Sequence, residues 1–378
     1  MLSGIPSTAT IAGVKLSRIS VLLLGVLLFI PGQAEVRLDQ IRLPPGFRIS
    51  IYAKDVENAR QMVRAEQGTI FVGSRHAGKV WALSDTDNDQ RADKVRLIDS
   101  GLNMPSGVEF RDSALYVGAI GRILRYDSIE SSLDQPPTPV VVSDALPDNT
   151  SHGWKYLRFG PDGKLYIPVG APCNVCDERG FGEIRHMNPD GSDMTTFARG
   201  VRNSVGLAFH PENHMLWFTD NGRDHLGDDL PADELNHAPE PAMHFGFPYC
   251  HQGDLLDEEY GKGRDCGDYT PPVARLDPHG AALGLAFYTG NMFPAEYTNR
   301  LFIVQHGSWN RSEKVGYRIL SLRVLADGTV VNQEVFASGW LQGEQAWGRP
   351  NDVMVMPDGA LLVSDDYADV IYRISYAQ

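Results

Sequence analysis

Short apolar runs recur along the chain, and each is bounded by turns rich in Gly, Pro, Asn and Asp. Apolar and polar residues alternate within a run, and β-branched and aromatic side chains are frequent. This pattern is typical of β-strands joined in hairpins. Six units repeat it, and their second runs are residues 68–74, 113–119, 163–169, 214–220, 299–305 and 359–365.

Most units continue into a third apolar run, at residues 78–84, 121–127, 182–188, 317–323 and 370–376. The fourth unit instead meets a polar stretch at residues 221–236. Each unit is long enough for one four-stranded antiparallel sheet, and radial repetition of such sheets makes a β-propeller. We therefore predict an all-β, six-bladed propeller over residues 35–378, with a long loop insert around 221–280. A pair of β-sandwiches and a β-helix are the rival architectures.

The first 34 residues predict a secretory signal peptide. Lys15 and Arg18 precede an apolar run at 21–30, and the small residues Gly32 and Ala34 follow it. We expect cleavage after Ala34 and export, with the periplasm as the expected compartment. A membrane anchor is disfavoured because a spanning helix needs about 20 apolar residues.

Charge and cysteine content narrow the class further. The chain has 34 Lys+Arg and 48 Asp+Glu, a formal net charge of −14, which argues against a nucleic-acid partner. Its four Cys are too few for a disulfide scaffold. In an oxidising compartment we expect two disulfides, Cys173–Cys176 and Cys250–Cys266, although four cysteines allow three pairings. Asp177 stands where a haem-attachment motif requires His.

Residues just before the first run of each unit are expected to converge at the centre of a propeller. These positions are 59–61, 104–106, 151–153, 200–203, 278–280 and 348–350. They hold two His and three Arg, which predicts a polar, cationic pocket for a small anion such as a polycarboxylate, because guanidinium groups pair with carboxylates. A polar, water-filled seam is the alternative.

Two acidic stretches are candidate metal sites. Asp85, Asp87, Asp89 and Asp93 stand at positions 1, 3, 5 and 9 of DTDNDQRAD, a spacing of oxygen ligands that suits Ca²⁺. The helix–loop–helix version is excluded, since it requires Gly at position 6 and Glu at position 12. This leaves a calcium-binding turn or a solvated acidic turn. The carboxylates of residues 219–236 allow the same two interpretations.

Segments from nearly the whole predicted mature chain resemble the soluble pyrroloquinoline-quinone (PQQ) sugar dehydrogenases, in particular the sorbosone and aldose sugar dehydrogenase branch. They include SHGWKYLRFGPDGKLYIPVGAPCNVC, ARGVRNSVGLAFHP, LWFTDNGRDHLGDD, HGSWNRS and GRPNDV. The resemblance implies an exported six-bladed propeller enzyme that transfers hydride from a sugar to PQQ.

The resemblance also implies roles for single residues. His152 would be the general base that takes the proton of the anomeric hydroxyl. Arg202 and Asn203 would hydrogen-bond the ortho-carbonyls of the quinone, and Arg202 would stabilise the charge that develops there. Main-chain oxygens of Gly222 and Arg223 would hold a catalytic Ca²⁺ that polarises the reacting carbonyl.

Three further cationic residues fall where this family places partners for the carboxylates of the cofactor, namely Arg349, His306 and Arg311. The expected partners are a small-molecule sugar and, since no haem motif is present, an external electron acceptor that is a quinone or a cytochrome. A Ca²⁺-dependent lactonase-type hydrolase and a non-catalytic binding propeller remain the alternatives. The sequence leaves the oligomeric state open.

Overall fold

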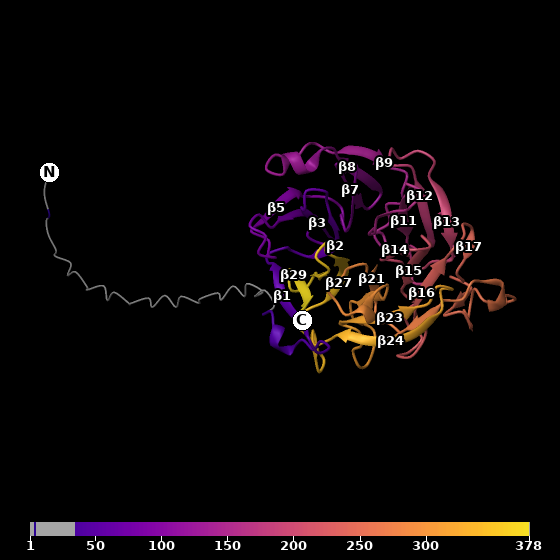
Figure 1. The fold of residues 1–378 in the computed structure, drawn as a ribbon. Coiled ribbons are helices and arrows are strands. Elements are labelled where there is room, and N and C mark those ends of the chain that lie inside the picture. Colours follow the sequence, from indigo (N-terminus) through magenta and orange to yellow (C-terminus); the bar gives the residue numbers. More distant parts are fainter. Residues whose placement is uncertain (1–3, 5–34, 378) are drawn as a thin grey trace. The chain divides into compact units, whose positions relative to one another are not determined.

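The computed structural model describes residue 4 and residues 35–377 (Figure 1). The chain divides into two units, Met1–Gln33 and Ala34–Gln378, and the second unit holds the fold. Apart from Gly4, the predicted signal peptide lies outside the described residues. Within the described part of the chain, no helix has both the length and the apolar character needed to cross a membrane.

The second unit is an all-β, six-bladed propeller, as predicted (Figure 1). The first blade pairs β2 (Ala59–Arg64), β3 (Ile70–Ser74), β4 (Val80–Ser84) and β5 (Lys94–Asp99). The second pairs β6 (Gly107–Arg111), β7 (Ala114–Ala119), β8 (Arg122–Tyr126) and β9 (Val140–Ser143). The third pairs β10 (Arg158–Phe159), β11 (Leu165–Val169), β12 (Glu183–Met187), β13 (Thr195–Arg199) and β17 (Met243–His244).

The fourth blade pairs β14 (Leu207–Phe209), β15 (Leu216–Asp220), β16 (Asp233–Ala238) and β20 (Ala274–Leu276). The fifth pairs β21 (Ala282–Phe287), β22 (Leu301–Gln305), β23 (Arg318–Val324) and β24 (Val330–Ala337). The sixth pairs β27 (Pro350–Val355), β28 (Leu361–Asp365), β29 (Val370–Tyr376) and β1 (Phe47–Ala53).

Shorter elements lie in the connections between the blade strands. Two hairpins are β18 (Cys250–His251) with β19 (Leu255–Leu256), and β25 (Leu341–Gln342) with β26 (Gln345–Ala346). The 3-10 helices are η1 (Leu38–Gln40), η2 (Ile129–Ser132), η3 (Cys266–Asp268) and η4 (Ala295–Tyr297).

The predicted second runs are β3, β7, β11, β15, β22 and β28, and the predicted third runs are β4, β8, β12, β23 and β29. The prediction of a loop over 221–280 is wrong in part. β16 and β20 complete the fourth blade, and β17 adds a parallel strand to the third. The alternation of β16 was hidden because its Asp233, Glu234 and Asn236 are buried polar residues.

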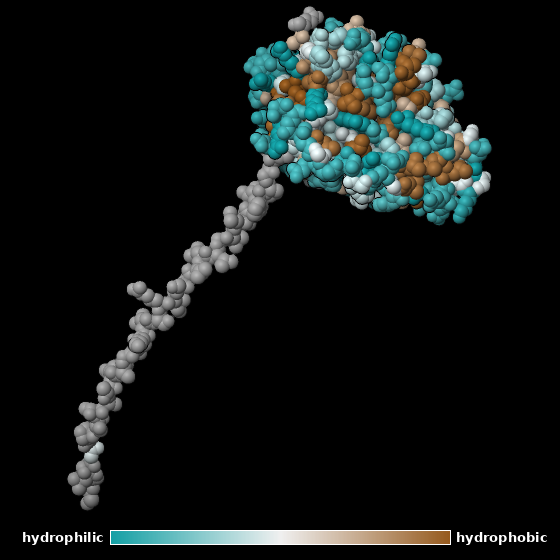
Figure 2. Space-filling model, turned by 90° about the horizontal axis from the view of Figure 1, so that it is seen from below, coloured by the Kyte–Doolittle hydropathy of each residue, from teal (hydrophilic) through white to brown (hydrophobic). Residues whose placement is uncertain are grey.

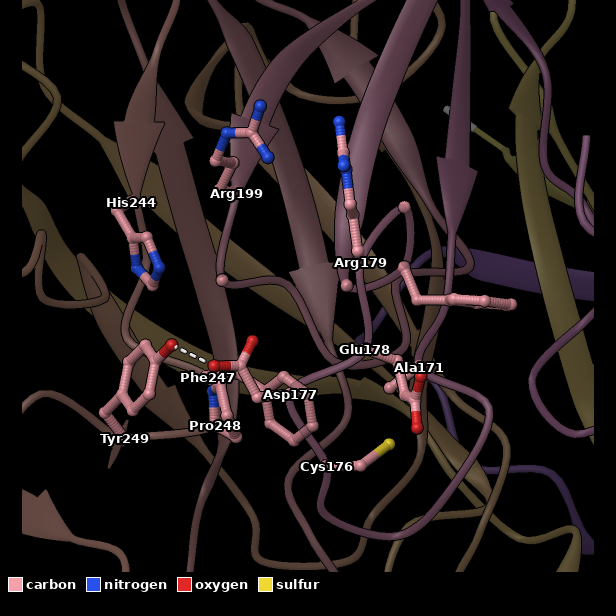
Figure 3. A pocket seen from close by; sticks show the side chains of 14 residues that line it. Ala171, Cys176, Asp177, Glu178, Arg179, Arg199, His244, Phe247, Pro248 and Tyr249 are labelled. Carbon is pink, nitrogen blue, oxygen red and sulfur yellow. Dashed lines mark hydrogen bonds between the residues drawn. The ribbon is translucent and has the colours of Figure 1, made fainter. Parts of the chain in front are cut away.

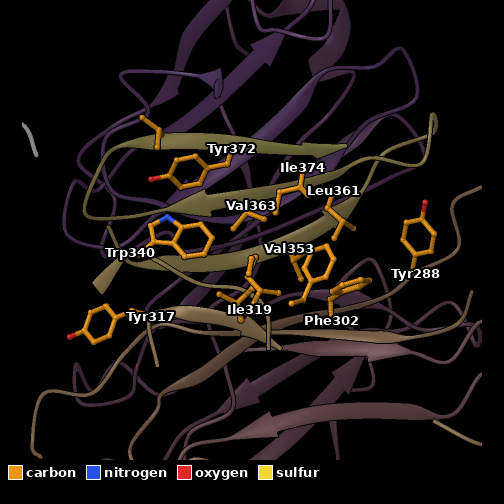
Figure 4. Packing of buried hydrophobic residues seen from close by; sticks show 14 of the residues in the cluster. Tyr288, Phe302, Tyr317, Ile319, Trp340, Val353, Leu361, Val363, Tyr372 and Ile374 are labelled. Atoms are coloured by element: carbon orange, nitrogen blue, oxygen red, sulfur yellow. The ribbon is translucent and has the colours of Figure 1, made fainter. Parts of the chain in front are cut away.

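Strands from the two ends of the propeller unit close the ring. β1 pairs antiparallel with β29, so that Phe47 lies opposite Tyr376. The Phe47 ring makes edge-to-face contacts with Phe293, Tyr297, Phe336 and Tyr376, at centroid distances of 4.7–5.2 Å. Figure 4 shows the adjoining buried cluster, in which side chains of the fifth and sixth blades meet. On the face seen in Figure 2, apolar residues form separate patches within a mainly hydrophilic surface.

Buried polar side chains connect neighbouring blades near the axis. The Gln61 side chain donates to the carbonyl oxygen of Leu157 (2.6 Å) and accepts from the amides of Val108 (3.1 Å) and Leu157 (2.9 Å). Asp352 accepts from the Met62 amide at 2.9 Å. These bonds satisfy backbone groups that would otherwise be buried without partners, and they fix the inner strands on which the central loops stand.

Phe47→Ala should weaken ring closure. Truncating a fully buried aromatic costs about 3–5 kcal/mol, and the partly buried Phe47 contacts four other rings, so we expect a loss near the lower end of that range in the free energy of unfolding. Urea denaturation measures it. Val331→Ala, at a half-exposed side chain of β24, is the control and should change stability by less than about 0.5 kcal/mol. Equal effects of the two substitutions would contradict this role of Phe47.

Candidate functional site

A cavity of about 450 Å³ lies where loops of five blades converge. Most of its lining residues lie at or just before the start of the first strand of a blade, or in the loop after the second strand. Both positions face the cavity because, in an antiparallel pair, the start of one strand and the end of its neighbour lie at the same sheet edge. The inner-turn residues 104–106 of the second blade, predicted to converge with the others, are not part of this lining.

The cavity brings together most of the predicted site residues. Its lining includes His152, Arg202, Asn203, Gly222, His306 and Arg349, with Arg60 and His279 from the repeat analysis. Two predicted residues point elsewhere. The Arg311 side chain donates to the carbonyl oxygens of Asp228 and Glu313, and Arg223 Nη1 pairs with Asp257 Oδ2 at 2.5 Å. These bonds hold both side chains outside the lining of the cavity, while the metal-binding role predicted for the main-chain oxygen of Arg223 stays a prediction.

His152 presents a free imidazole nitrogen. Its Nδ1 lies 2.8 Å from the Ala171 carbonyl oxygen, which only accepts, so Nδ1 carries the proton. Nε2 then keeps its lone pair and has no hydrogen-bond partner among the described residues. Burial and the nearby Arg202 guanidinium lower the pKa of His152 to about 4. The ring is therefore a neutral base at physiological pH.

Two glycines allow this placement of His152. A Cβ on Gly170 would lie 2.7 Å from the His152 Cβ and 2.8 Å from its carbonyl oxygen. A Cβ on Gly153 would lie 1.9 Å from the Asn149 carbonyl oxygen. His152 itself has a positive φ of 48° and stands at a tight turn. Gly170 therefore lets the end of β11 approach the loop before β10, and Gly153 lets that loop turn tightly on itself.

Arg202 is 4% exposed and uses all five of its guanidinium N–H donors within the protein. Nε donates to the Asn174 carbonyl oxygen at 2.9 Å. Nη1 donates to the carbonyl oxygens of Asn221 (3.1 Å) and Gly222 (2.8 Å), and Nη2 to Asn174 Oδ1 (2.9 Å) and Asp224 Oδ2 (3.1 Å). The predicted hydrogen bond from this side chain to a quinone therefore does not fit the geometry. Arg202 acts on a ligand through its charge.

A second set of cations retains free donors. Arg60, Arg75 and Arg349, here called the arginine cluster, line the cavity, and each has a buried Nε without a partner in the described chain. Trp154 Nε1 is a fourth such donor, and the Arg75 guanidinium lies 3.7 Å from the centroid of the Trp154 ring. Four orphaned donors around one cavity fit a ligand rich in acceptor atoms.

One carboxylate balances the arginine cluster only in part. Asp366 pairs with Arg60 Nη2 at 2.5 Å and with His306 Nε2 at 2.8 Å. Although burial opposes ionisation, these two neighbours hold the pKa of Asp366 well below its usual range. Burial, together with Arg349, lowers the pKa of His306 to about 4 against the opposing pull of Asp366. Three guanidinium groups thus face a single carboxylate, which leaves this part of the cavity positive.

Buried carboxyl groups support the loops below the cavity. Asp220 accepts from the amides of Arg202 (2.7 Å) and Asn203 (2.6 Å). Asp233 accepts from the amides of Gly222 (3.0 Å) and Ala282 (3.1 Å). Burial raises the pKa of Asp220 to about 8 and that of Asp233 to about 7. The acidic stretch 219–236 therefore contributes loop-supporting acceptors.

The acidic turn between β4 and β5 lies at the opposite edge of its blade from the cavity. Ligand oxygens of Asp85, Asp87 and Asp89 all lie within 4.8 Å of one another, the only such group of acidic, His or Cys side chains in the described chain. Asp93 stands apart from it, because its carboxylate accepts from the amide and the hydroxyl of Thr86, each at 2.6 Å. Calcium binding at this turn stays a prediction.

Both expected disulfides, Cys173–Cys176 and Cys250–Cys266, are present. Cys176 also lines a second cavity of about 360 Å³ on the outer side of its loop (Figure 3). Arg179 and Arg199 lie at one end of this cavity and Cys176 at the other, and Tyr249 donates to Asp177 at 2.5 Å.

Sequence reasoning missed Arg75, Trp154 and Asp366. Arg75 and Asp366 directly follow β3 and β28, the second strands of their blades. The sequence positions of these two residues could have revealed them, because the end of a second strand lies at the same sheet edge as the start of the first strand. The predicted convergence considers only residues that precede the first strand of each unit, so Arg75 and Asp366 are not among them.

A protein-family model described as "Domain of unknown function (DUF7133)" matches residues 33–375. An uncharacterized protein of Borreliella burgdorferi is 33% identical over 358 residues, which cover 91% of this chain and 93% of that protein. The aldose sugar dehydrogenase YliI of Escherichia coli is 26% identical over 204 residues, 51% of this chain and 48% of that protein. A PQQ-dependent pyranose dehydrogenase of Coprinopsis cinerea is 23% identical over 344 residues, 77% of this chain and 46% of that protein. The chain spans about half the length of the last two relatives.

Solved structures share the fold. The calcium structure of a Trichoderma reesei family AA12 enzyme superposes with a TM-score of 0.80 at 18% identity, covering 92% of this chain and 100% of that one. The PQQ-bound aldose sugar dehydrogenase of Streptomyces coelicolor gives 0.61 at 20% identity, covering 88% and 99%. The resemblance to PQQ-dependent sugar dehydrogenases seen in the sequence is thus confirmed.

The buried neutral imidazole of His152 predicts a loss of stability in acid. Its pKa of about 4 in the folded state lies below the ordinary value of 6.5, so the unfolded chain takes up the proton first. The contribution of neutral His152 to the free energy of unfolding is complete above pH 6.5 and is lost as the pH falls towards 4. Urea denaturation at several pH values should show a shallower decline for His152→Asn, since Asn also tolerates positive φ. His214→Asn, at an exposed turn, should decline like the wild type; equal slopes for all three proteins would contradict the assignment.

Proposed function

Since the chain belongs to the family described as a domain of unknown function, DUF7133, and is similar to PQQ-dependent sugar dehydrogenases, we propose that it is a quinoprotein that oxidises an aldose or a related, sorbosone-like aldehyde sugar. The observation that carries this proposal is one cavity that holds both a neutral base and a set of unsatisfied cations. The base is His152, and the cations are the arginine cluster.

The donors around the cavity fit PQQ, which is a tricarboxylate with two adjacent carbonyl groups. Arg60, Arg75 and Arg349 would hold its carboxylates, and Trp154 Nε1 is a further donor to an acceptor atom. The side-chain amide of Asn203 lines the same cavity without a partner in the described chain and would donate to a carbonyl oxygen of the quinone. Arg202 would stabilise negative charge there without a direct bond.

The chain's own part in the reaction is to orient the sugar and remove one proton. When bound, PQQ would supply the acceptor for the hydride that leaves the anomeric carbon of the sugar. His152 Nε2 takes the proton of the anomeric hydroxyl in the same step, and an aldose becomes a lactone. The Nδ1–Ala171 bond keeps the ring in the accepting tautomer and stabilises the imidazolium that forms. An external quinone or cytochrome would then receive the two electrons.

The predicted Ca²⁺ site does not fit the arrangement around Gly222. The carbonyl oxygen of Gly222 already accepts from Arg202 Nη1 at 2.8 Å, and the Asn221 carbonyl oxygen accepts from the same nitrogen. A metal ion at the Gly222 oxygen would lie beside this buried cation, and the role of the Arg223 main-chain oxygen stays a prediction. We therefore assign no step to a metal ion at this position.

The arginine cluster should determine affinity for the quinone. Removing one partner of a buried charge pair costs 2–5 kcal/mol, so Arg75→Gln and Arg349→Gln should each weaken PQQ binding on the order of 100-fold. Calorimetric titration of the mature protein measures this. Arg323→Gln, at an exposed position of β23, is the matched control and should bind like the wild type. Wild-type affinity in both cluster variants would contradict the proposed placement of the carboxylates.

His152→Asn should separate catalysis from binding. Without the base, turnover of an aldose with an artificial electron acceptor should fall by about 10²–10⁴-fold, while PQQ affinity changes little. Steady-state kinetics on PQQ-loaded protein gives the first quantity and calorimetry gives the second. His214→Asn should retain full turnover. If His152→Asn also retained it, another group would have to be the base.

A further inference from the structure

We propose that the segment 171–176, in which the Cys173–Cys176 disulfide closes residues 173–176 into a ring, positions both His152 and Arg202, so that reducing this disulfide weakens quinone binding and slows turnover. The inference rests on the proposed function for its catalytic consequence. The positioning itself is a property of this chain, whatever ligand the cavity takes. The residue at its centre is Asn174, a positioning residue that acts through Arg202.

The short segment that begins at Ala171 holds both functional residues. The Ala171 carbonyl oxygen accepts from His152 Nδ1 at 2.8 Å, and the Ala171 amide donates to the Arg202 carbonyl oxygen at 2.8 Å. Three residues later, the carbonyl oxygen and Oδ1 of Asn174 each accept from the Arg202 guanidinium at 2.9 Å. Asn174 therefore supplies two of the five acceptors that saturate this buried cation.

Asn174 also fixes the loop after β15. Its Oδ1 accepts from the Asp224 amide at 2.8 Å, and its Nδ2 donates to the Asp224 carbonyl oxygen at 3.1 Å. Asp224 in turn pairs with Arg202 Nη2 at 3.1 Å and accepts from Asn310 Nδ2 at 2.7 Å. Asn174 thus links loops of the third and fourth blades around Arg202, and Asp224 extends this link to the fifth.

The disulfide is the main local restraint on Asn174. Residues 170–182 connect β11 to β12 without forming a helix or strand, so no ladder of backbone bonds holds Asn174 in place. A covalent ring reduces the number of conformations that such a loop adopts. On its outer side the loop borders the cavity of Figure 3, which reaches Cys176.

The two disulfides differ in access. Cys173 and Cys176 are both partly exposed, whereas in the second disulfide only Cys266 is partly exposed and Cys250 is 2% exposed. Dithiothreitol should therefore reduce Cys173–Cys176 first. The S–S bond takes up two electrons and two protons and becomes two thiols, while dithiothreitol is oxidised to its cyclic disulfide.

The test combines two Asn174 variants with a double-mutant cycle. Asn174→Ala removes the Oδ1 acceptor and should weaken PQQ binding about tenfold or more, because hydrogen bonds to charged groups are among the stronger ones. Asn174→Asp keeps an acceptor for Arg202 and for the Asp224 amide but loses the Nδ2 donor to Asp224, so it should weaken binding less than Asn174→Ala does. Asn188→Ala is the control, since the Asn188 side chain bonds only Ser192 and Asp193 in an exposed turn.

The disulfide should act through Asn174. Cys173→Ser/Cys176→Ser should weaken PQQ binding to the same extent as Asn174→Ala, and combining all three substitutions should add nothing further. Cys250→Ser/Cys266→Ser is the control for losing a disulfide in general. Full additivity, or an equal effect of the two disulfide pairs, would overturn the inference.

Hydrogen exchange gives a readout that needs no quinone. The Asp224 amide should exchange faster in Asn174→Ala and after mild reduction with dithiothreitol, and at the wild-type rate in Asn188→Ala. If the wild type binds no PQQ, the proposed function fails while the exchange data still decide the positioning. If the wild type binds PQQ, and Asn174→Ala changes neither its affinity nor the exchange of Asp224, the positioning role is wrong.

Discussion

The burial of the Arg202 guanidinium is the constraint on which the arrangement of the site depends. A buried cation is costly unless each of its donors is paired, and here five donors find five acceptors on two loops. These loops come from the third and fourth blades and include Asn174, Asn221, Gly222 and Asp224. Satisfying one side chain therefore fixes the walls of the cavity, and through Ala171 it also fixes the ring of His152.

The cavity has two cationic sides with different roles. Arg202 is saturated, so it shapes the site and contributes charge at a fixed place. The arginine cluster keeps buried donors free and faces one carboxylate, Asp366, so it attracts an anion. This local positive charge lies within a chain whose formal net charge is −14. An acidic protein with such a cavity selects for a small, multiply charged anion, and that is the chemistry expected of a carboxylate-bearing quinone.

Much of this architecture could be predicted from the sequence, because strand alternation and turn residues are local signals. They located the strands that follow residues 68 and 359 and the convergence of His152, Arg202 and Arg349. β16 escaped prediction because its inward positions are polar, and Arg75 and Asp366 escaped because only one of two equivalent sheet-edge positions was compared. The saturation of Arg202 could not have been predicted, since it depends on carbonyl directions in loops that are far apart in the chain.

The most direct test of the account is a stopped-flow experiment on the PQQ-loaded protein, mixed with a panel of aldoses and aldehyde sugars. Hydride transfer within the cavity predicts a single phase of quinone reduction for at least one sugar, with an amplitude that matches the number of sites. That phase should slow when the transferred hydrogen is replaced by deuterium. A loaded protein whose quinone spectrum is unchanged by every sugar in the panel would contradict the assignment as a sugar dehydrogenase.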